Sequence, residues 1–334
     1  MKVLIVGGTG LISTGIVEHL LERGAAITLF NRKQRANRLP SELPVITGDR
    51  NVPAEFEQRL ERERFDVVID MICFSPAQAE ATVRAFAGRT EQLIFCSTVC
   101  TYGADIPPGV LIDESFAQRP INEYARNKLV CEQRLRRAQA EGAFALSVVR
   151  PSNTYGPGAS LIDQMEFDSA VWDRVENGLP VLCAGDGLGL WQSTHRSDVG
   201  RFFAYAAGNP QTYGEDFNAT REHVFTWRDY YREAAQALGV TARLVLVPAG
   251  WVIAQNPRRF GFLSEISRYH GAYSSEKARR AVPEFRGAID FVAGARETFA
   301  DIKRRGAWRR HQDDAEYEAL VRRAQALGFE ELSA

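Results

Sequence analysis

The sequence predicts a doubly wound α/β fold, in which a parallel sheet carries helices on both faces. Short apolar runs alternate with amphipathic helical stretches through the first half of the chain, which is the pattern of βαβ units. Runs such as FDVVID and QLIFCS are continuously apolar, as in strands that are buried on both faces. A glycine-rich turn, VGGTG, joins the first strand to the first helix.

The elements of this fold follow one another in a regular order. We expect strands at 2–6, 26–30, 44–47, 66–70, 92–96 and 145–149, with helices at 11–23, 53–62, 76–87 and 122–141. Beyond Pro151 this rhythm changes, because Pro, Gly and aromatic residues become frequent. There we expect a smaller, less regular lobe with longer helices near 162–177, 226–238 and 289–304, and a charged amphipathic tail helix within 309–328 that acts as a solvated cover or an oligomer contact.

The domain boundary falls near this change of rhythm. We assign residues 1–154 to the sheet domain and 155–334 mainly to a smaller substrate-binding lobe with C-terminal helices. The segment SDVGRFFAYAA, at 197–207, has the pattern of a further core helix. We therefore expect parts of the chain near 190–220 to belong to the sheet domain as well.

Composition excludes several classes of protein. The 334 residues are 45% hydrophobic and 25% charged with a net charge of −1, so nothing draws the whole molecule to nucleic acid or to anionic lipid. Five cysteines without a CxxC pair are typical of reduced thiols in the cytosol. No signal peptide or membrane span is visible, and the histidines lack metal-ligand spacing. We expect a cytoplasmic protein without metal, membrane or nucleic-acid partners.

The first turn has the spacing of a phosphate-binding loop. Gly7, Gly10 and Ser13 fit a GxxGxxG pattern in which serine replaces the last glycine. Such a turn lets the backbone approach a pyrophosphate, and the following helix presents free N–H groups to it. The serine hydroxyl could also face the pyrophosphate. This interpretation makes the fold Rossmann-type; the alternative is a tight turn without a ligand.

The residues after the second and third strands bear on the choice of cofactor. Position 31, where an acidic residue would bind the ribose diol of NAD, holds Asn31, followed by Arg32 and Lys33. Loss of the carboxylate and gain of cations favour NADP over NAD, although both cations could belong to a solvated loop. After the third strand comes Asp49-Arg50; Asp49 could reach the adenine amino group or cap the next turn.

A tyrosine and a lysine have the spacing of an acid–base pair. Tyr124 and Lys128 lie four residues apart in an expected helix, so they share one face. A nearby ammonium and an oxidised nicotinamide would lower the pKa of the phenol, which suits it to proton transfer near neutral pH. Thr98, at the end of the fifth strand, can hydrogen-bond the substrate oxygen or cap the strand end, as can Ser97.

Together these motifs resemble the extended short-chain dehydrogenase/reductase family, specifically its NAD-dependent epimerase/dehydratase group. The resemblance rests on VGGTGLIS, CSTVCTYG, YARNK, VVRPSNTYGPG, GDGLGLWQSTHRSDVG, FNATREHVFTWRDYYREAAQALG and SSEKARRAV, and it spans at least residues 1–300. Ser13 and the Asn31-Arg32 pair depart from the family pattern. Val99 and Cys100 beside Thr98, where dehydratases of this group place acidic residues, argue against a 4,6-dehydratase.

The resemblance implies roles for particular residues. Thr98 would polarise the substrate oxygen, Tyr124 would be the acid/base, and Lys128 would anchor the ribose and modulate the tyrosine. The residues expected to bind the cofactor are Gly7, Thr9, Gly10, Leu11, Ile12, Ser13, Asn31, Arg32, Lys33, Asp49, Arg50, Met71, Ile72, Cys73, Tyr124, Lys128, Pro151 and Asn153. Those expected to bind the substrate are Thr98, Asn153, Tyr155, Trp191, Gln192 and His195; His195 could equally be a structural hydrogen-bonding residue. Arg258 and Arg259 could bind phosphate or face water.

The expected function is that of an NAD(P)-dependent sugar epimerase that acts on a nucleotide sugar as a possible homodimer. Hydride transfer would occur at a secondary hydroxyl or ketone carbon, with Tyr124 as acid/base. One alternative is a net NADPH-dependent reductase or dehydrogenase of a small carbonyl or sugar substrate. The other is a non-catalytic relative that binds RNA on the same scaffold.

Overall fold

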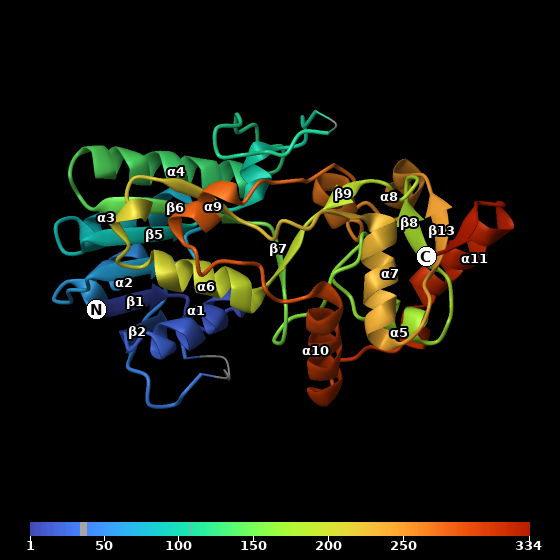
Figure 1. Ribbon diagram of the computed structural model, residues 1–334, viewed down its shortest axis with the longest axis horizontal. Helices are drawn as coiled ribbons and strands as arrows, with labels where there is room; N and C mark the ends of the chain where they lie inside the picture. Colours follow the sequence, from blue (N-terminus) through green and yellow to red (C-terminus); the bar gives the residue numbers. More distant parts are fainter. Residues whose placement is uncertain (34–38, 108) are drawn as a thin grey trace.

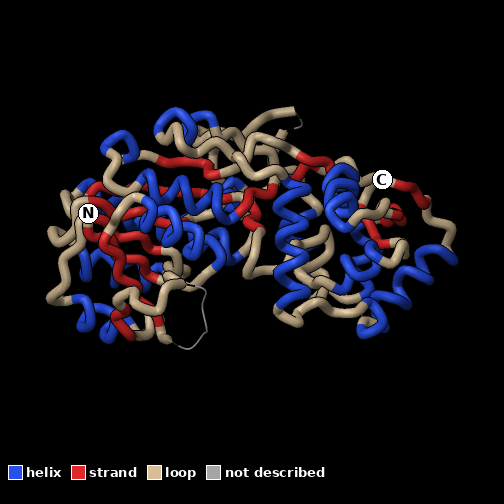
Figure 2. Tube along the Cα trace, turned by 60° about the horizontal axis from the view of Figure 1, so that its bottom comes forward, coloured by secondary structure: helices blue, strands red, loops and turns tan. Residues whose placement is uncertain are grey.

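The computed structural model describes residues 1–33, 39–107 and 109–334. Figures 1 and 2 show two bodies side by side along the long axis, a sheet with its helices at the N-terminal end and a helix-rich lobe at the C-terminal end. The two chain termini lie at opposite ends of the molecule (Figure 1).

A seven-stranded parallel sheet forms the centre of the N-terminal body in the described part of the chain, with the order β11-β6-β5-β4-β1-β2-β3. The first six strands in sequence are those expected, and the seventh comes from the second half of the chain. Their bounds are β1 Lys2–Val6, β2 Ala26–Asn31, β3 Val45–Thr47, β4 Val67–Asp70, β5 Gln92–Cys96, β6 Ala145–Pro151 and β11 Asp216–Ala219. The chain order reverses between β1 and β4, which places a crevice at the carboxyl ends of these strands.

Each face of the sheet is covered by helices, as the continuous apolar runs predict. On one face Val3 and Ile5 pack with residues of α1, α6 and α9. On the other face Leu4 and Val6 pack with residues of α2, α3 and α4. The helix bounds are α1 Leu11–Glu22, α2 Pro53–Leu60, α3 Pro76–Phe86, α4 Glu123–Ala140, α6 Arg196–Ala206 and α9 Glu276–Ala281.

Helices α1 and α6 approach each other closely through two glycines. A Cβ on Gly15 would lie 2.5 Å from the carbonyl oxygen of Arg196, and one on Gly200 would lie 2.4 Å from the carbonyl carbon of Gly15. His19 reinforces the contact, because its Nε2 lies 2.9 Å from the hydroxyl of Ser197. The expected core helix at 197–207 is therefore confirmed as part of the sheet body.

The C-terminal lobe has its own apolar core, which includes Trp172, Trp227, Tyr230 and Phe291. A short sheet, ordered β14-β13-β8, supports α11, and Tyr317 on that helix accepts a hydrogen bond from Leu182 N at 3.0 Å. The remaining strands are β7 Asn153–Tyr155, β8 Val181–Ala184, β9 Leu190–Trp191, β10 Ser193–His195, β12 Phe225–Thr226, β13 Arg243–Val247 and β14 Glu331–Ser333. The helices and short turns are α5 Ala170–Glu176, α7 Trp227–Leu238, α8 Ala249–Gln255, α10 Phe291–Arg304, α11 Ala315–Ala326, η1 Val99–Tyr102, η2 Pro210–Thr212, η3 Leu263–Ser267 and η4 His311–Asp313.

One expected helix is only half formed. The segment 162–177 is helical only in α5, because polar side chains bind the backbone of the preceding stretch. Asp163 accepts hydrogen bonds from the backbone of Met165 and Glu166, and Asp168 accepts one from Ala170 N. Such local acceptors compete with helix formation. Among the described residues, no helix has the length and apolar character needed to cross a bilayer.

Candidate active site

The turn after β1 forms one wall of a cleft of about 410 Å³ at the carboxyl edge of the sheet. Gly7 has φ +88° there, and a Cβ on it would lie 2.6 Å from Ile72 Cγ2. Only glycine fits that position without strain. Gly10 lies at the N-cap of α1, where the free N–H groups of the helix face the cleft. This arrangement fits a dinucleotide pyrophosphate.

Ser13, near the start of α1, stabilises the turn through a side-chain hydrogen bond. Its hydroxyl donates a hydrogen bond to Gly7 O at 2.8 Å, and the residue is 2% exposed. We expected that this hydroxyl could also face the pyrophosphate; instead its proton is committed to the turn. Thr9 and Gly10 line the cleft directly, while Leu11 and Ile12 are half-buried at the start of α1.

The end of β2 supplies the cationic side of the cleft. Asn31, Arg32 and Lys33 line it together with Asp49. Asn31 Oδ1 accepts from Lys33 N at 2.8 Å, and Asp49 Oδ1 accepts from Asn51 N at 2.9 Å, so Asp49 caps the turn as one expectation had it. Arg32 Nη1 lies 3.9 Å from Asp49 Oδ2, with both side chains partly exposed. This pair is open to solvent and can rearrange around a ligand.

Arg50 does not extend into the cleft as a free cation. Its Nη2 donates to Asp70 Oδ2 at 3.0 Å and to Gln78 O at 2.7 Å, and its guanidinium lies 4.0 Å from the ring centroid of Phe56. Arg50 is nevertheless one of the residues that line the cleft, and among the described residues its Nε and Nη1 have no hydrogen-bond partner, so its expected role in cofactor binding stays a prediction. Its Nη2 also ties the end of β4 to α3.

The residues after β4 lie between the cofactor cleft and the catalytic residues. Ile72 and Phe74 line the cleft, while Met71 and Cys73 are buried beneath it. Cys73 contributes its carbonyl oxygen, which accepts a hydrogen bond from Lys128 Nζ at 2.9 Å. Phe74 was not singled out by any sequence motif, yet its ring contacts both Tyr124 and Lys128.

Thr98 and Tyr124 come together where β5 and α4 meet the crevice between the two bodies. Thr98 caps η1 by accepting from Cys100 N at 3.2 Å. Burial raises the pKa of Tyr124 above its ordinary value, the thiols of Cys96 and Cys100 act in the same direction, and a hydrogen bond with Thr98 lowers it. Tyr124 is still 44% exposed, so this burial is partial and solvent reaches the residue beside Thr98.

The ammonium of Lys128 makes contacts other than those expected. The residue is 1% exposed, and its ammonium donates to Cys73 O at 2.9 Å and to Cys96 O at 2.7 Å. It lies 4.4 Å from the ring centroid of Phe74, and the ring of Phe74 is itself 6.4 Å from that of Tyr124. Lys128 is not among the groups that shift the pKa of Tyr124 in this structure. The expected lowering of that pKa involves a bound oxidised nicotinamide as well and stays a prediction; in this structure two carbonyl groups and an aromatic ring hold the ammonium.

A buried ionic network, which the sequence analysis missed, supports the strand ends. Arg150 and Glu132 are each 1% exposed and pair at 2.6 Å. Glu132 also accepts a hydrogen bond from Ser97, and Arg150 donates to Tyr102 at 3.0 Å. The network therefore holds the residues next to Thr98 and Pro151. The available signal was the position of Glu132, four residues after Lys128 on the same helix.

Three residues expected at the substrate lie in packed surroundings instead. Gln192 is 2% exposed; its amide donates to Arg221 O and Tyr273 O and accepts from Tyr273 N. His195 caps α6 through Nδ1, and burial and then Arg196 lower its pKa to about 4. Tyr155 packs edge-on against His195 at 5.3 Å. Gln192 and Tyr155 are therefore buried in this structure, whereas His195 takes the structural role that was the alternative for it.

The two other expected substrate residues lie nearer the crevice. Trp191 lines a narrow crevice of about 40 Å³ with Cys100 and Asn122, and it stacks on Trp227 at 4.8 Å. Asn153 is half-buried, and its Oδ1 accepts from Ser193 at 2.9 Å. Pro151 ends β6 beside Ala219.

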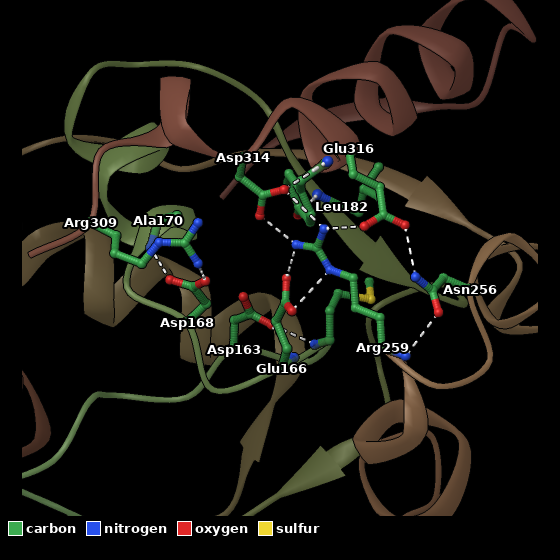
Figure 3. A network of polar contacts seen from close by, with 12 residues as sticks. Asp163, Glu166, Asp168, Ala170, Leu182, Asn256, Arg259, Arg309, Asp314 and Glu316 are labelled. Carbon is green, nitrogen blue, oxygen red and sulfur yellow. Dashed lines mark hydrogen bonds and ion pairs between the residues drawn. The ribbon is translucent and has the colours of Figure 1, made fainter.

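Arg259, considered for phosphate binding, is enclosed by carboxylates of its own lobe. Figure 3 shows its guanidinium between Glu166, Asp314 and Glu316. It lies 2.6 Å from Glu166 and 3.0 Å from Glu316, and it also pairs with Asp314. The expectation that it might hold a ligand phosphate is corrected. In the described part of the chain, no group of three acidic, cysteine or histidine residues could hold a metal ion.

The fold and the site together define a class of protein, the nicotinamide-dependent oxidoreductases with a Tyr-x-x-x-Lys pair. The chain belongs to the NAD dependent epimerase/dehydratase family, whose model matches residues 3–220. The family resemblance seen in the motifs is thereby confirmed, as are the Rossmann-type fold and the enzyme class. The chain is therefore an enzyme of the NAD-dependent epimerase/dehydratase type.

Similar proteins span most of the chain. A 2'-dehydrokanamycin reductase of Streptomyces kanamyceticus is 28% identical and covers 85% of this chain and 80% of its own. The chloroplast stem-loop binding protein of 41 kDa b of Arabidopsis thaliana is 27% identical, covering 93% and 82%. A UDP-glucose 4-epimerase of Thermus thermophilus in complex with NAD has a TM-score of 0.71 at 22% identity, covering 91% of this chain and 99% of its own.

Proposed function

We propose that the protein transfers a hydride between NADP and a secondary carbinol or ketone carbon of a sugar, with Tyr124 as the acid/base. The observation that carries this proposal is that Tyr124 is hydrogen-bonded with Thr98 and packs on Phe74, a residue of the cleft wall. Gly7, Gly10, Asn31 and Arg32 would hold the dinucleotide. When bound, its nicotinamide accepts or supplies the hydride.

The residues of the chain supply the proton chemistry. During reduction the carbonyl oxygen of the substrate takes a proton from the Tyr124 hydroxyl, while Thr98 hydrogen-bonds the same oxygen. Tyr124 is 44% exposed, so solvent can return the proton to the phenolate. During oxidation the proton moves in the opposite direction. Lys128 would orient the ribose, and its position is fixed by the carbonyl oxygens of Cys73 and Cys96.

The preference for NADP rests on charge. Asn31 removes the carboxylate that would repel a 2′-phosphate, and Arg32 lies at the cleft, where its ion-pair partner among the described residues is the partly exposed Asp49. Arginine binds phosphate through two parallel N–H donors. A 2′-phosphate would compete well for Arg32, because an exposed ion pair contributes little stability.

A net reductase is the second candidate, and one observation favours it over an epimerase. The reductase relative covers 85% of this chain, far more than the 46% matched by the UDP-glucose 4-epimerase of Azospirillum brasilense. An epimerase returns its hydride to the same substrate and retains its cofactor, whereas a reductase releases it in each turnover.

One purification distinguishes the two reactions. The protein is purified, denatured, and the released nucleotide is identified by absorbance and mass spectrometry. Stoichiometric retained nucleotide supports an epimerase. A nucleotide-free protein that consumes NADPH with ketone substrates supports a reductase. Failure to bind either NAD or NADP would contradict the proposal as a whole.

The stem-loop binding relative makes a nucleic-acid role a further outcome to test. Filter binding to RNA hairpins at two salt concentrations measures it, because phosphate contacts give a steep dependence on salt. We expect no such binding from a chain of net charge −1, and we expect the protein to work in the cytoplasm, possibly as a homodimer.

A further inference from the structure

Phe74 is a large apolar residue that is exposed at the edge of the cofactor cleft. It is 46% exposed and lines the cleft together with Ile72, whereas Cys73, one position earlier, is fully buried. Exposed apolar residues are common on protein surfaces, so exposure by itself does not indicate a function. What distinguishes Phe74 is that its ring also contacts the expected acid/base, Tyr124.

The backbone that carries Phe74 is fixed by hydrogen bonds on both sides of the residue. Phe74 N and Ser75 N both donate to Gln78 Oε1, at 2.6 and 3.2 Å. The Ser75 hydroxyl accepts from Gln78 N at 3.3 Å and completes the capping box of α3. On the other side, Cys73 O accepts from the Lys128 ammonium at 2.9 Å. A bound ligand would therefore meet a preorganised apolar surface, which reduces the cost of binding.

The ring of Phe74 lies against the two residues expected to act on the substrate and on the cofactor ribose. Its centroid is 4.4 Å from the Lys128 ammonium and 6.4 Å from the ring centroid of Tyr124. Lys128 is itself buried, and its ammonium also lies 4.9 Å from the ring centroid of Phe95. A ribose that Lys128 orients therefore lies beside the ring of Phe74.

The strand order assigns Phe74 to one particular half of a bound dinucleotide. The order β4-β1-β2-β3 puts the glycine turn after β1 in the middle of the cleft, Asn31 and Arg32 at the end of β2 on one side, and Phe74 after β4 on the other. Ligands of such sheets bind across the carboxyl ends of the strands. With the 2′-phosphate at Arg32 and the pyrophosphate at the glycine turn, the nicotinamide half extends toward Phe74.

We propose that the ring of Phe74 packs against the nicotinamide nucleoside of the bound cofactor, and that this contact selects the complete dinucleotide over a fragment that ends at the pyrophosphate. The inference rests on the proposed function, because it adds a specificity-determining residue to the cofactor site. An aromatic ring offers a large, rigid apolar surface to a planar ligand ring. Its contact with Tyr124 places that ligand ring next to the acid/base.

The test measures by calorimetry the binding of NADP and of 2′-phosphoadenosine 5′-diphosphate, which is NADP without its nicotinamide nucleoside. Phe74→Ala should weaken NADP binding about tenfold, a difference of about 1.4 kcal/mol, and leave the affinity for the fragment within about twofold. Phe74→Tyr keeps an aromatic ring and should bind NADP within about twofold of wild type. Phe167→Ala, at a phenylalanine that is 61% exposed outside the cleft, should change neither affinity.

Three results in the variants would overturn the inference. These are an unchanged NADP affinity in Phe74→Ala, equal losses for NADP and the fragment in that variant, or a loss in Phe74→Tyr as large as that in Phe74→Ala. Binding of the fragment also shows that the cleft of each variant is intact. In the wild type, equal affinity for NADP and the fragment would contradict the inference alone, whereas binding of neither would contradict the proposed function.

Discussion

Tyr124 depends on a small number of contacts for its chemistry. Its phenol meets Thr98 and the ring of Phe74, while Lys128 is buried against two carbonyl groups. The spacing of four residues correctly predicted that Tyr124 and Lys128 share one helix face. Spacing alone does not predict which acceptor groups the Lys128 ammonium binds. The residue-scale consequence is that Lys128 is held by backbone carbonyl groups rather than by the phenol.

Arg32 tests the choice of cofactor at the same scale. We expect Arg32→Ala to weaken NADP binding about tenfold, the loss of one charge-assisted hydrogen bond at a partly exposed site. NAD binding should stay within a factor of about two, because NAD lacks the 2′-phosphate. Fluorescence titration with both cofactors measures the two affinities. An equal loss for both would contradict the assignment of Arg32 to the 2′-phosphate.

His195 links a single residue to pH-dependent stability. Its pKa is lowered from 6.5 to about 4, first by burial and then by Arg196, and the exposed carboxylate of Glu297 lies 3.7 Å from its Nε2. Between these two pKa values the unfolded chain binds more protons than the folded one, so the free energy of unfolding rises with pH through that window and is fully regained above about 6.5. Acidification from pH 7 to pH 5 should therefore lower the free energy of unfolding by about 2 kcal/mol through this group.

Urea unfolding of wild type and His195→Asn at both pH values measures the effect. Asparagine retains an N-cap acceptor for α6 but cannot titrate. On acidification, the free energy of unfolding of the variant should therefore fall by about 2 kcal/mol less than that of the wild type. Parallel losses in the two proteins would show that His195 is not responsible.

At the scale of elements, the packing of α1 on α6 decides the position of the cofactor cleft. Gly15 and Gly200 allow the two helices to approach, and α1 begins at the glycine turn that faces the cleft. Gly200 lies in the second half of the chain, and neither its role nor the edge strand β11 follows from local sequence patterns. Only the tertiary contact explains them.

A matched pair of glycine substitutions tests this contact. Gly200→Ala should destabilise the protein by about 1–3 kcal/mol, because the new Cβ meets the backbone of Gly15 and the close-packed helices must separate. Gly250→Ala, in α8 with nothing within 4 Å of the new Cβ, should change stability by less than about 1 kcal/mol. Thermal unfolding compares the two. Equal effects would mean that the helix contact is not limiting.

At the scale of the whole molecule, the first half of the fold was predictable from the sequence and much of the second half was not. The six strands and their helices in the first half follow from apolar periodicity and turn residues, and the positions of the glycine turn, Thr98 and Tyr124 follow from strand ends. The elements of the second half are less predictable from local patterns. Their strands are only two to five residues long, and the core is built from aromatic residues that are distant in sequence. The domain boundary at 154/155 stays a prediction.

The residues around the substrate show the same limit. Gln192, His195 and Tyr155 lie near the site in sequence motifs, yet β7 and β10 pair beneath it and bury them. Glu265 and Tyr269 reach the crevice from a turn that no motif indicated. Residues on strand ends were predictable because a parallel sheet aligns those ends, whereas residues contributed by the second lobe depend on how the two bodies meet.

The central claim is that Tyr124 transfers the proton beside a bound nicotinamide, and Tyr124→Phe tests it most directly. The phenyl ring keeps the packing against Phe74 but has no proton to give. We predict that NADP affinity, measured by fluorescence titration, stays within about twofold, while kcat falls by about 10²–10⁴, the usual contribution of a positioned acid or base. A variant that turns over at the wild-type rate would contradict the account.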